Sequence, residues 1–170
     1  MDVNSITAVC AVVIALASLV ATLIGAKTAR EHDRQSVRPV LQIIRTKTHG
    51  DKRTGLKIVN VGLGPAVIVN TATELDGKPI GSWNRKAFDL LVGPNKPLPG
   101  FSALYDGTVI PAGGERFLIY IDPFKDRRHS WFWELVAHRV TVETRYESLY
   151  GGENFSASIG PRPPDSGNLL

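Results

Sequence analysis

Residues able to support catalysis or metal binding are few in this chain and lie far apart in the sequence. Its four histidines are His32, His49, His129 and His138. No two of them have the spacing that places zinc ligands on one face of a helix or strand. Ser130 follows His129 directly, but neighbours on a helix point apart, so this pair does not make a nucleophile and its base. We expect no catalytic residue, no metal ligand and no cofactor, and therefore not an enzyme.

Gly62 and Gly64 resemble part of a dinucleotide-binding loop. Such a loop needs a helix after it, because the phosphates bind at a helix N-terminus. Pro65 and an apolar β-type segment follow instead. The spacing therefore excludes a dinucleotide site. An enzyme whose site is assembled from several loops stays open as an alternative, since such a site leaves no local pattern.

The main cluster of binding-type residues runs from Arg127 to Trp133. It holds two of the three tryptophans beside basic residues, and Trp and Arg dominate the hot spots of protein interfaces. We predict a partner surface that consists of Arg127, Arg128, Trp131 and Trp133. The cluster could also anchor at a membrane interface. The pattern favours a third interpretation, a helix that caps one end of the fold with its aromatic side chains inward, because aromatic residues at helical spacing usually lie in the core.

Residues 6–26 form an apolar segment long enough to cross a membrane. No charged side chain occurs from Val3 to Ala26, and about twenty helical residues span the roughly 30 Å hydrocarbon core. A secretory signal peptide is the main rival, but residues 1–5 lack the basic charge with which such peptides begin. A buried soluble helix is a second rival, though one this long normally carries a polar face. We predict a single-pass transmembrane helix.

Basic residues follow this segment and none precede it. They are Lys27, Arg30, Arg34 and Arg38. Because Lys and Arg beside a span stay in the cytoplasm, we expect residues 1–5 outside the inner (cytoplasmic) membrane and the C-terminal domain in the cytoplasm. Residues 27–38 form a basic connector that should continue the helix and bend before Pro39. Its cations either bind lipid headgroups of the bilayer or act only as the topology signal.

Small residues recur along the apolar segment at steps of three and four. This stripe consists of Ala8, Ala11, Ala15, Ser18, Thr22 and Gly25. Small side chains let helix backbones approach closely in lipid, so the stripe predicts a homo-oligomer formed through the span. Alanine is also frequent off the stripe, at Ala17, Ala21 and Ala26, and a simple excess of alanine explains the pattern as well.

Residues 39–159 have the pattern of a β domain. Short apolar runs alternate with turn residues, and Arg139 to Tyr146 alternates most clearly. Asp76-Gly77 indicates a hairpin. About seven or eight short strands favour an immunoglobulin-like β-sandwich, although one cysteine, Cys10, is too few for the usual disulfide between the sheets. The proline-containing residues 160–170 should be a disordered tail.

The individual elements of this domain follow from the same patterns. Strands are predicted at residues 40–47, 56–61, 66–75, near Ile80, 103–110, 115–121, 139–146 and 154–159. Residues 83–92 read as a helical turn or an irregular insertion, and 93–100 as a loop. Residues 126–138 read as one short helix.

Two motifs resemble a known group of proteins. One is His32-Asp33-Arg34-Gln35-Ser36-Val37-Arg38-Pro39, and the other is Asn60-Val61-Gly62-Leu63-Gly64-Pro65-Ala66. Together with the N-terminal span, they resemble small bacterial single-pass membrane proteins of uncharacterised function, which have a similar connector and a β domain with a similar turn. The resemblance implies the architecture and no particular activity.

The net charge of +4 and a sequence pI of about 9.4 raise the question of a nucleic-acid partner. No dense Lys/Arg tract is present, and a basic surface close to the membrane accounts for the charge, so we expect no nucleic acid. The leading hypothesis is a non-enzymatic membrane-anchored binding or scaffolding module with a cytoplasmic protein or ligand as partner. The alternative is an oligomerising, membrane-perturbing effector of toxin or anti-phage type, whose β domain senses a signal.

Overall fold

The computed structural model describes residues 3–47, 53–94 and 96–162, without the side chains of residues 3–10 and 29–36. The chain divides into two compact units, Met1–Val37 and Arg38–Leu170. The first contains one helix, and the second contains every strand of the described residues.

Helix α1 runs from Val3 to Ser36. Within it, Ala11–Thr28 has a mean hydropathy of 2.0, and none of it is buried against the rest of the chain. This stretch is long and apolar enough to cross a membrane, although a signal sequence near an N-terminus shares both properties. The helix ends shortly before Pro39, whose ring disfavours the helical conformation at Arg38.

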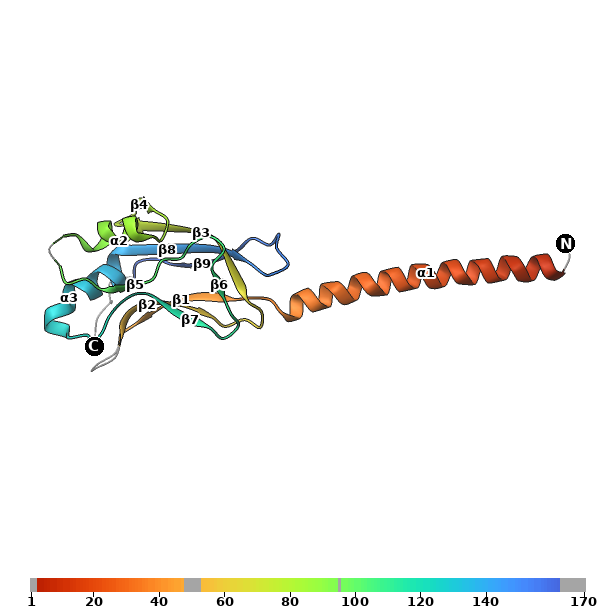
Figure 1. The fold of residues 1–170 in the computed structure, drawn as a ribbon, viewed down its shortest axis with the longest axis horizontal. Helices are drawn as coiled ribbons and strands as arrows, with labels where there is room; N and C mark the ends of the chain where they lie inside the picture. The colour runs from red at the N-terminus through yellow and green to blue at the C-terminus, as the bar shows by residue number, and fades with distance from the viewer. Residues whose placement is uncertain (1–2, 48–52, 95, 163–170) are drawn as a thin grey trace, which may run out of the picture. The chain divides into compact units, whose positions relative to one another are not determined.

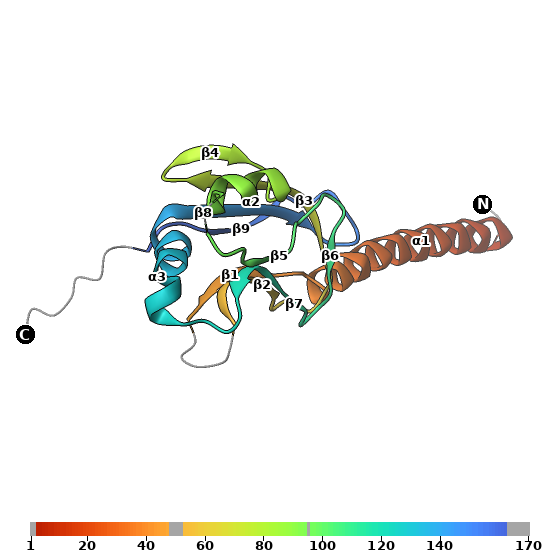
Figure 2. The same cartoon turned by 60° about the vertical axis from the view of Figure 1, so that its left-hand side comes forward.

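Two antiparallel sheets make up the second unit (Figure 1). The first sheet contains, in spatial order, β1 (Leu41–Thr46), β2 (Thr54–Asn60), β7 (Glu115–Ile121) and β5 (Gly100–Phe101). The second contains β4 (Lys78–Gly81), β3 (Ala66–Leu75), β8 (Val140–Glu147) and β9 (Phe155–Ile159), and the short β6 (Val109–Ile110) pairs with β3. Figure 2 shows the sheet of β3, β8 and β9 facing that of β1, β2 and β7.

This strand order is that of an immunoglobulin-like sandwich. Such domains have strands A, B, E and D in one sheet and C′, C, F and G in the other. The order β1-β2-β7-β5 matches the first set, and β4-β3-β8-β9 matches the second. The predicted fold class is confirmed as a mainly β chain with an immunoglobulin-like sandwich after an N-terminal apolar helix, but the sandwich contains more short helices than the one predicted for it.

The core lies between the two sheets and follows the alternation along their strands. Leu56 and Ile58 of β2 are fully buried. On β8 the side chains at alternate positions face inward, and they are Val140, Val142, Thr144 and Tyr146. The strand predicted from the alternation of residues 139–146 is therefore confirmed, because burial of one face requires a period of two.

Helix α2 (Arg85–Val92) packs between β4 and β5. Asn84 caps its N-terminus, where its Oδ1 accepts the Ala87 N–H at 3.1 Å. The buried Phe88 lies with its ring centroid 4.6 Å from that of Phe101 in β5. The sequence allowed either a helical turn or an irregular insertion at residues 83–92. A helix forms because Asn84 caps it and its apolar face is buried.

Other segments differ from the prediction. Helix α3 (Asp126–Glu134) is followed by a π-helical turn, Leu135–Arg139, so the single helix predicted over 126–138 is two segments. The strand predicted over 103–110 is reduced to β6, because Gly107 at φ 81° forms a turn before it. Strand β5 was not predicted at all, since it directly follows a stretch with three prolines, Pro94, Pro97 and Pro99.

The motif that begins at Asn60 holds three segments together. Asn60 is fully buried, and its Oδ1 accepts the N–H groups of Gly62 at 3.0 Å and Val40 at 3.2 Å. Its Nδ2 donates to the carbonyl oxygens of Gly64 at 2.8 Å and Ile110 at 3.0 Å. Every donor and acceptor of this amide is therefore used, as a buried polar side chain requires.

The same motif binds the chain near Arg38, the first residue of the second unit. We call this end of the sandwich the Arg38 end. A Cβ on Gly62 would lie 2.3 Å from the Val40 nitrogen and 2.5 Å from the Arg38 oxygen, so only glycine fits there. The Arg38 oxygen also accepts the Leu63 N–H at 3.1 Å. Strand β8 finishes at this end, where the Tyr146 hydroxyl accepts the Leu41 N–H at 3.1 Å.

Part of the predicted disordered tail is bound to the sandwich. The Gly160 carbonyl accepts a hydrogen bond from Arg45, and the Arg162 N–H donates to the Ala137 carbonyl at 2.7 Å. Burial lowers the pKa of Arg45, and the charge of Arg162 lowers it further. Residues 163–170 lie outside the described residues.

Candidate functional site

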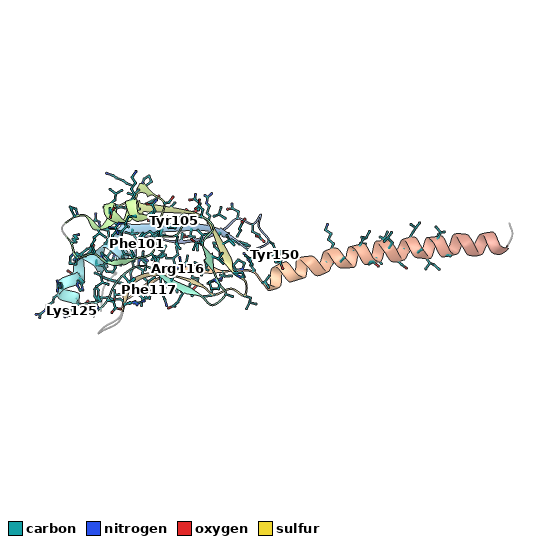
Figure 3. The ribbon with its side chains drawn as sticks, in the orientation of Figure 1. Phe101, Tyr105, Arg116, Phe117, Lys125 and Tyr150 are labelled. Carbon is teal, nitrogen blue, oxygen red and sulfur yellow. The ribbon has the colours of Figure 1, made fainter. Side chains whose placement is uncertain are left out.

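The segment predicted as a partner surface lies at the end of the sandwich opposite the Arg38 end. Helix α3 lies in the connection between β7 and β8. Strand β7 ends at Ile121, and Ile121 pairs with Thr54, the first residue of β2. Figure 3 shows Lys125, just before α3, and Tyr150, in the β8–β9 loop, at opposite ends of the sandwich.

Local hydrogen bonds around Lys125 determine how α3 begins. The Lys125 carbonyl accepts the N–H groups of Arg128 at 3.0 Å and His129 at 2.8 Å, and the Lys125 N–H donates to His129 Nδ1 at 2.9 Å. His129 is buried, with its ring 5.7 Å from that of Phe124. Burial lowers the pKa of His129, and the nearby charges of Arg128 and Lys125 lower it further. His129 is thus a structural residue of this turn.

A lysine lies over each of the two tryptophans of α3. Lys96 Nζ is 4.6 Å from the centre of the Trp131 ring, and Lys47 Nζ is 5.2 Å from that of Trp133. Both tryptophans are half-buried and pack against the core through one side of the ring system. Each cation–π contact is worth about 0.5–1 kcal/mol where, as here, the lysine is open to solvent. These pairs leave aromatic surface and positive charge together at this end of the molecule.

An open groove is linked to Trp131 through Lys96. It has a volume of about 480 Å³ and lies between the end of α2 and the segment that follows it. Its lining is Phe88, Asp89, Val92, Gly93, Pro94, Lys96 and Leu98. Lys96 belongs both to this lining and to the contact with Trp131, while Leu98 is 73% exposed. The groove therefore combines an apolar wall with a cation at its rim.

The two arginines of the predicted surface are exposed at the start of α3. Arg127 and Arg128 directly follow Asp126, which already pairs with Lys47 at 3.2 Å. We define the distal surface as Lys96, Arg127, Arg128, Trp131 and Trp133 together with the groove. Its half-buried tryptophans and solvated arginines fit both sequence-based interpretations, a binding surface and a capping helix.

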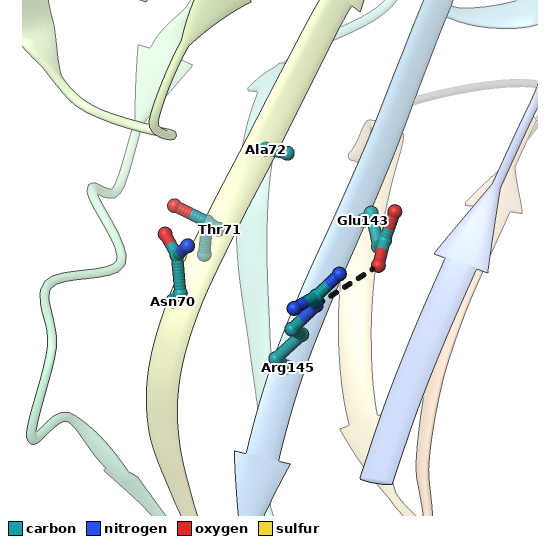
Figure 4. Close-up of a pocket in the computed structure, with 5 residues that line it drawn as sticks. All are labelled: Asn70, Thr71, Ala72, Glu143 and Arg145. Carbon is teal, nitrogen blue, oxygen red and sulfur yellow. Dashed lines mark hydrogen bonds and ion pairs between the residues drawn. The ribbon is translucent and has the colours of Figure 1, made fainter. Parts of the chain in front are cut away.

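A second, smaller hollow lies on the outer face of the sheet of β3 and β8. It has a volume of about 150 Å³ and is lined by Asn70, Thr71, Ala72, Glu143 and Arg145. Figure 4 shows Arg145 directed along the strand toward Glu143, and the two form an ion pair at 3.4 Å. Such an exposed pair contributes little to stability, and the hollow has no apolar wall that would hold a ligand.

The remaining predicted site residues lie on α1 and at the Arg38 end. From Ala11 to Gly25 the stripe residues are exposed along α1, and the Thr22 hydroxyl donates to the Ser18 carbonyl at 2.8 Å. Lys27 is exposed. The Arg38 guanidinium lies 4.6 Å from the centre of the Phe155 ring. The side chains of Ala8, Arg30 and Arg34 lie outside the described ones.

Sequence reasoning missed Lys47, Lys96 and the groove. Lys47 directly follows β1 and Lys96 follows α2, so both are far from α3 in the sequence. No local pattern connects a lysine to a tryptophan some tens of residues away. Among the described residues, no group of three or more His, Cys, Asp or Glu side chains could hold a metal ion.

Comparison with known families gives one match. The model of a family described as a domain of unknown function (DUF8453) matches residues 3–160. No curated protein matches the chain. The matched region includes α1 as well as the sandwich, so the family is defined by both units.

Proposed function

The chain belongs to the family described as a domain of unknown function (DUF8453), and we propose that it is a non-enzymatic, membrane-anchored binding module. In this proposal α1 spans the cytoplasmic membrane with its N-terminus outside, and the sandwich lies in the cytoplasm. The one-sided basic charge after the apolar segment supports this orientation. The Asn60 motif and the connector support a place among small bacterial single-pass membrane proteins.

The observation that carries the proposal is the position of Lys96. It lies over Trp131 and at the same time at the rim of the groove beside α2. Aromatic side chains with adjacent cations and an apolar pocket are the features that concentrate binding energy in protein interfaces. We infer that the distal surface holds the partner, at the end of the sandwich away from the attachment to α1.

The charge of the distal surface indicates the chemistry of the partner. Arg127 and Arg128 are exposed, and the acid between Lys125 and Arg127, Asp126, is paired with Lys47. A partner segment with an apolar side chain for the groove, flanked by carboxylates for Lys96 and the arginines, matches this surface. We therefore propose an acidic protein segment as the partner.

Site-specific photo-cross-linking in the intact membrane tests the proposal. A photoreactive residue replaces Leu98, which is 73% exposed beside the groove, or Tyr105, which is 64% exposed and lies outside it. We expect one discrete cross-linked product from position 98 and none from position 105. The product should disappear in Lys96→Glu, because charge reversal repels the carboxylates, and should persist in Arg145→Glu. Equal products at both positions, or a product indifferent to Lys96→Glu, would contradict the proposal.

A second candidate function is an oligomerising effector that perturbs the membrane. The small-residue stripe supports it, because its steps of three and four continue within one unbroken helix, Val3–Ser36. Overexpression should then dissipate the membrane potential and stop growth. Normal growth and potential at high expression would eliminate this candidate and leave the binding module untouched.

A further inference from the structure

The β8–β9 loop presents two large side chains at the apex of a tight turn. The Gly151 N–H donates to the Ser148 carbonyl at 3.1 Å, so Leu149 and Tyr150 are the central residues of a β-turn. Leu149 is 68% exposed and Tyr150 is 51% exposed. Figure 3 shows Tyr150 at the Arg38 end. Turn centres favour Gly, Pro, Asn, Asp and Ser, so the turn itself does not explain these two residues.

The β2–β3 loop at the same end repeats this arrangement. Leu63 is 78% exposed, the most of any large hydrophobic residue among those described, and Val61 is 53% exposed. The loop is held rigidly, because Asn60 binds both of its glycines and the Leu63 N–H donates to the Arg38 carbonyl. A side chain this exposed adds little to the stability of the fold. Leu63 and Val61, together with Leu149 and Tyr150, form a group of exposed apolar and aromatic side chains at one end of the sandwich, and such a group marks an interaction surface.

The charges at the Arg38 end permit contact with an anionic surface. Glu147 Oε2 accepts the Gly152 N–H at 3.0 Å. Glu153 accepts the Ser148 hydroxyl at 2.8 Å and the Ser148 N–H at 3.2 Å. The Glu147 carboxylate, at the end of β8, and the Glu153 carboxylate, in the β8–β9 loop, are thus held by N–H and hydroxyl donors of this loop, and the Arg38 guanidinium lies against Phe155.

We propose that the Arg38 end docks on the lipid surface of the membrane, with Leu63, Leu149 and Tyr150 inserted among the headgroups. This inference rests on the proposed membrane anchor. The helical residues 29–36 amount to about 12 Å at 1.5 Å per residue, so this short tether keeps the Arg38 end close to the bilayer. Tyrosine and leucine beside arginine are side chains that favour the interface between anionic headgroups and acyl chains. The docked sandwich would turn its distal surface toward the cytoplasm.

Labelling in a bilayer tests the docking with the full chain. Cys10→Ser removes the only cysteine, and Leu63→Cys, Leu149→Cys or Leu98→Cys then accepts one environment-sensitive fluorophore. Leu98 is the matched control, because it is 73% exposed, close to the 78% of Leu63, and lies beside the groove at the opposite end. Each protein is reconstituted in vesicles of phosphatidylethanolamine and phosphatidylglycerol, with and without a lipid that carries a quencher.

We expect labels at 63 and 149 to shift to shorter wavelength and to be quenched severalfold more by the quencher lipid than the label at 98. Equal quenching at all three positions would overturn the docking. A wavelength shift without lipid quenching would also overturn it, because protein, such as a second copy of the chain, would then cover this end. Flotation with the vesicles separately reports the anchor: a protein that floats but is not quenched refutes only the docking, and one that does not float refutes the anchor.

Discussion

Thr71 of β3 pairs with Thr144 of β8, and both residues are buried. Their hydroxyl groups differ in hydrogen bonding. The Thr71 hydroxyl accepts the Trp83 N–H at 2.9 Å and so fixes the segment that leads into α2. The Thr144 hydroxyl has no hydrogen-bond partner among the described residues. A buried hydroxyl costs free energy unless it is hydrogen-bonded, so the two residues should respond differently to loss of the oxygen.

We predict different effects for the same Thr→Val substitution at these two positions, since it keeps the shape of the side chain and removes only the hydroxyl group. Thr71→Val leaves the Trp83 N–H unsatisfied and should lower the free energy of unfolding by about 1–2 kcal/mol. Thr144→Val removes an unpaired polar group and should leave the free energy of unfolding unchanged or raise it by up to about 1 kcal/mol. Urea unfolding of the full chain in micelles, followed by tryptophan fluorescence, measures both. Equal destabilisation by the two variants would refute the difference in hydrogen bonding.

His129 makes stability depend on pH in a defined range. Burial chiefly lowers its pKa below the ordinary value of 6.5, so the folded state favours the neutral ring that accepts the Lys125 N–H. The unfolded chain then binds a proton first as the pH falls. The stabilisation is complete above pH 6.5 and is lost as the pH falls from there through the lowered pKa.

We therefore predict that the free energy of unfolding decreases on acidification below pH 6.5, and that His129→Asn flattens this decrease. Asparagine offers a hydrogen-bond acceptor but does not titrate. His138→Asn serves as the comparison and should keep the decrease. Asp76 does not contribute to this pH dependence near pH 6.5. Its hydrogen bond with Arg139 lowers the pKa of Asp76 below the ordinary value of 3.8, so its effect on stability lies at lower pH. The same slope in His129→Asn as in the unmodified chain would show that another group is responsible.

At the scale of elements, α1 carries two separable features, its length and its stripe. The length follows from the apolar window Ala11–Thr28 and is sufficient for a span. The stripe bears on association of the span with other helices. The Thr22 hydroxyl already donates a hydrogen bond to the Ser18 carbonyl within α1, so it contributes little to polar contacts between helices. Close approach of backbones at the small residues is then the main basis for pairing.

Bulky residues on the stripe should therefore weaken self-association of the span. We expect Ala15→Leu with Ser18→Leu to reduce the signal of a membrane two-hybrid assay, because the leucines hold the backbones apart. The matched control is Ala17→Leu with Ala21→Leu, which adds the same bulk off the stripe and should leave the signal intact. An unchanged signal in the first pair would remove the stripe as an interface.

At the scale of the whole molecule, the sandwich has two ends with different surfaces. The Arg38 end carries exposed apolar turn residues, and the opposite end carries the lysine-covered tryptophans and the groove. The immunoglobulin-like strand order produces this division, because each long strand runs from one end to the other and the loops gather at both. Attachment and partner binding can therefore use separate loops of one fold.

The prediction that the sandwich lies in the cytoplasm can be tested with reporter fusions, and the charges beside the apolar segment of α1 can be reversed. A C-terminal green fluorescent protein should fluoresce, and a C-terminal alkaline phosphatase should be inactive, if the domain lies in the cytoplasm. Asp2→Lys and Asn4→Lys combined with Lys27→Glu and Arg30→Glu reverse the charge bias and should weaken or invert this result. Active phosphatase on the unmodified chain would place the sandwich on the other side of the membrane.

Local pattern was sufficient wherever one short segment decides its own conformation. The alternation along β8 is visible because one face of the strand is buried, and Asp76-Gly77 forms its hairpin turn because both residues adopt positive φ, at 53° and 74°. Strand β5 was missed because two residues become a strand only by pairing with β7. The π-helical turn was missed for a similar reason, since the buried residues Leu135, Val136 and Ala137 are fitted into the core after α3.

By itself the sequence determined an apolar N-terminal helix, a β-sandwich after it and the basic–aromatic segment of α3, because these depend on periodicity and composition over short stretches. Only the tertiary structure decided that Lys47 and Lys96 cover Trp133 and Trp131, that a groove adjoins them, and that Leu63 and Tyr150 share the Arg38 end. The reason is physical: these neighbours come from loops far apart in the chain, and strand pairing alone brings those loops together.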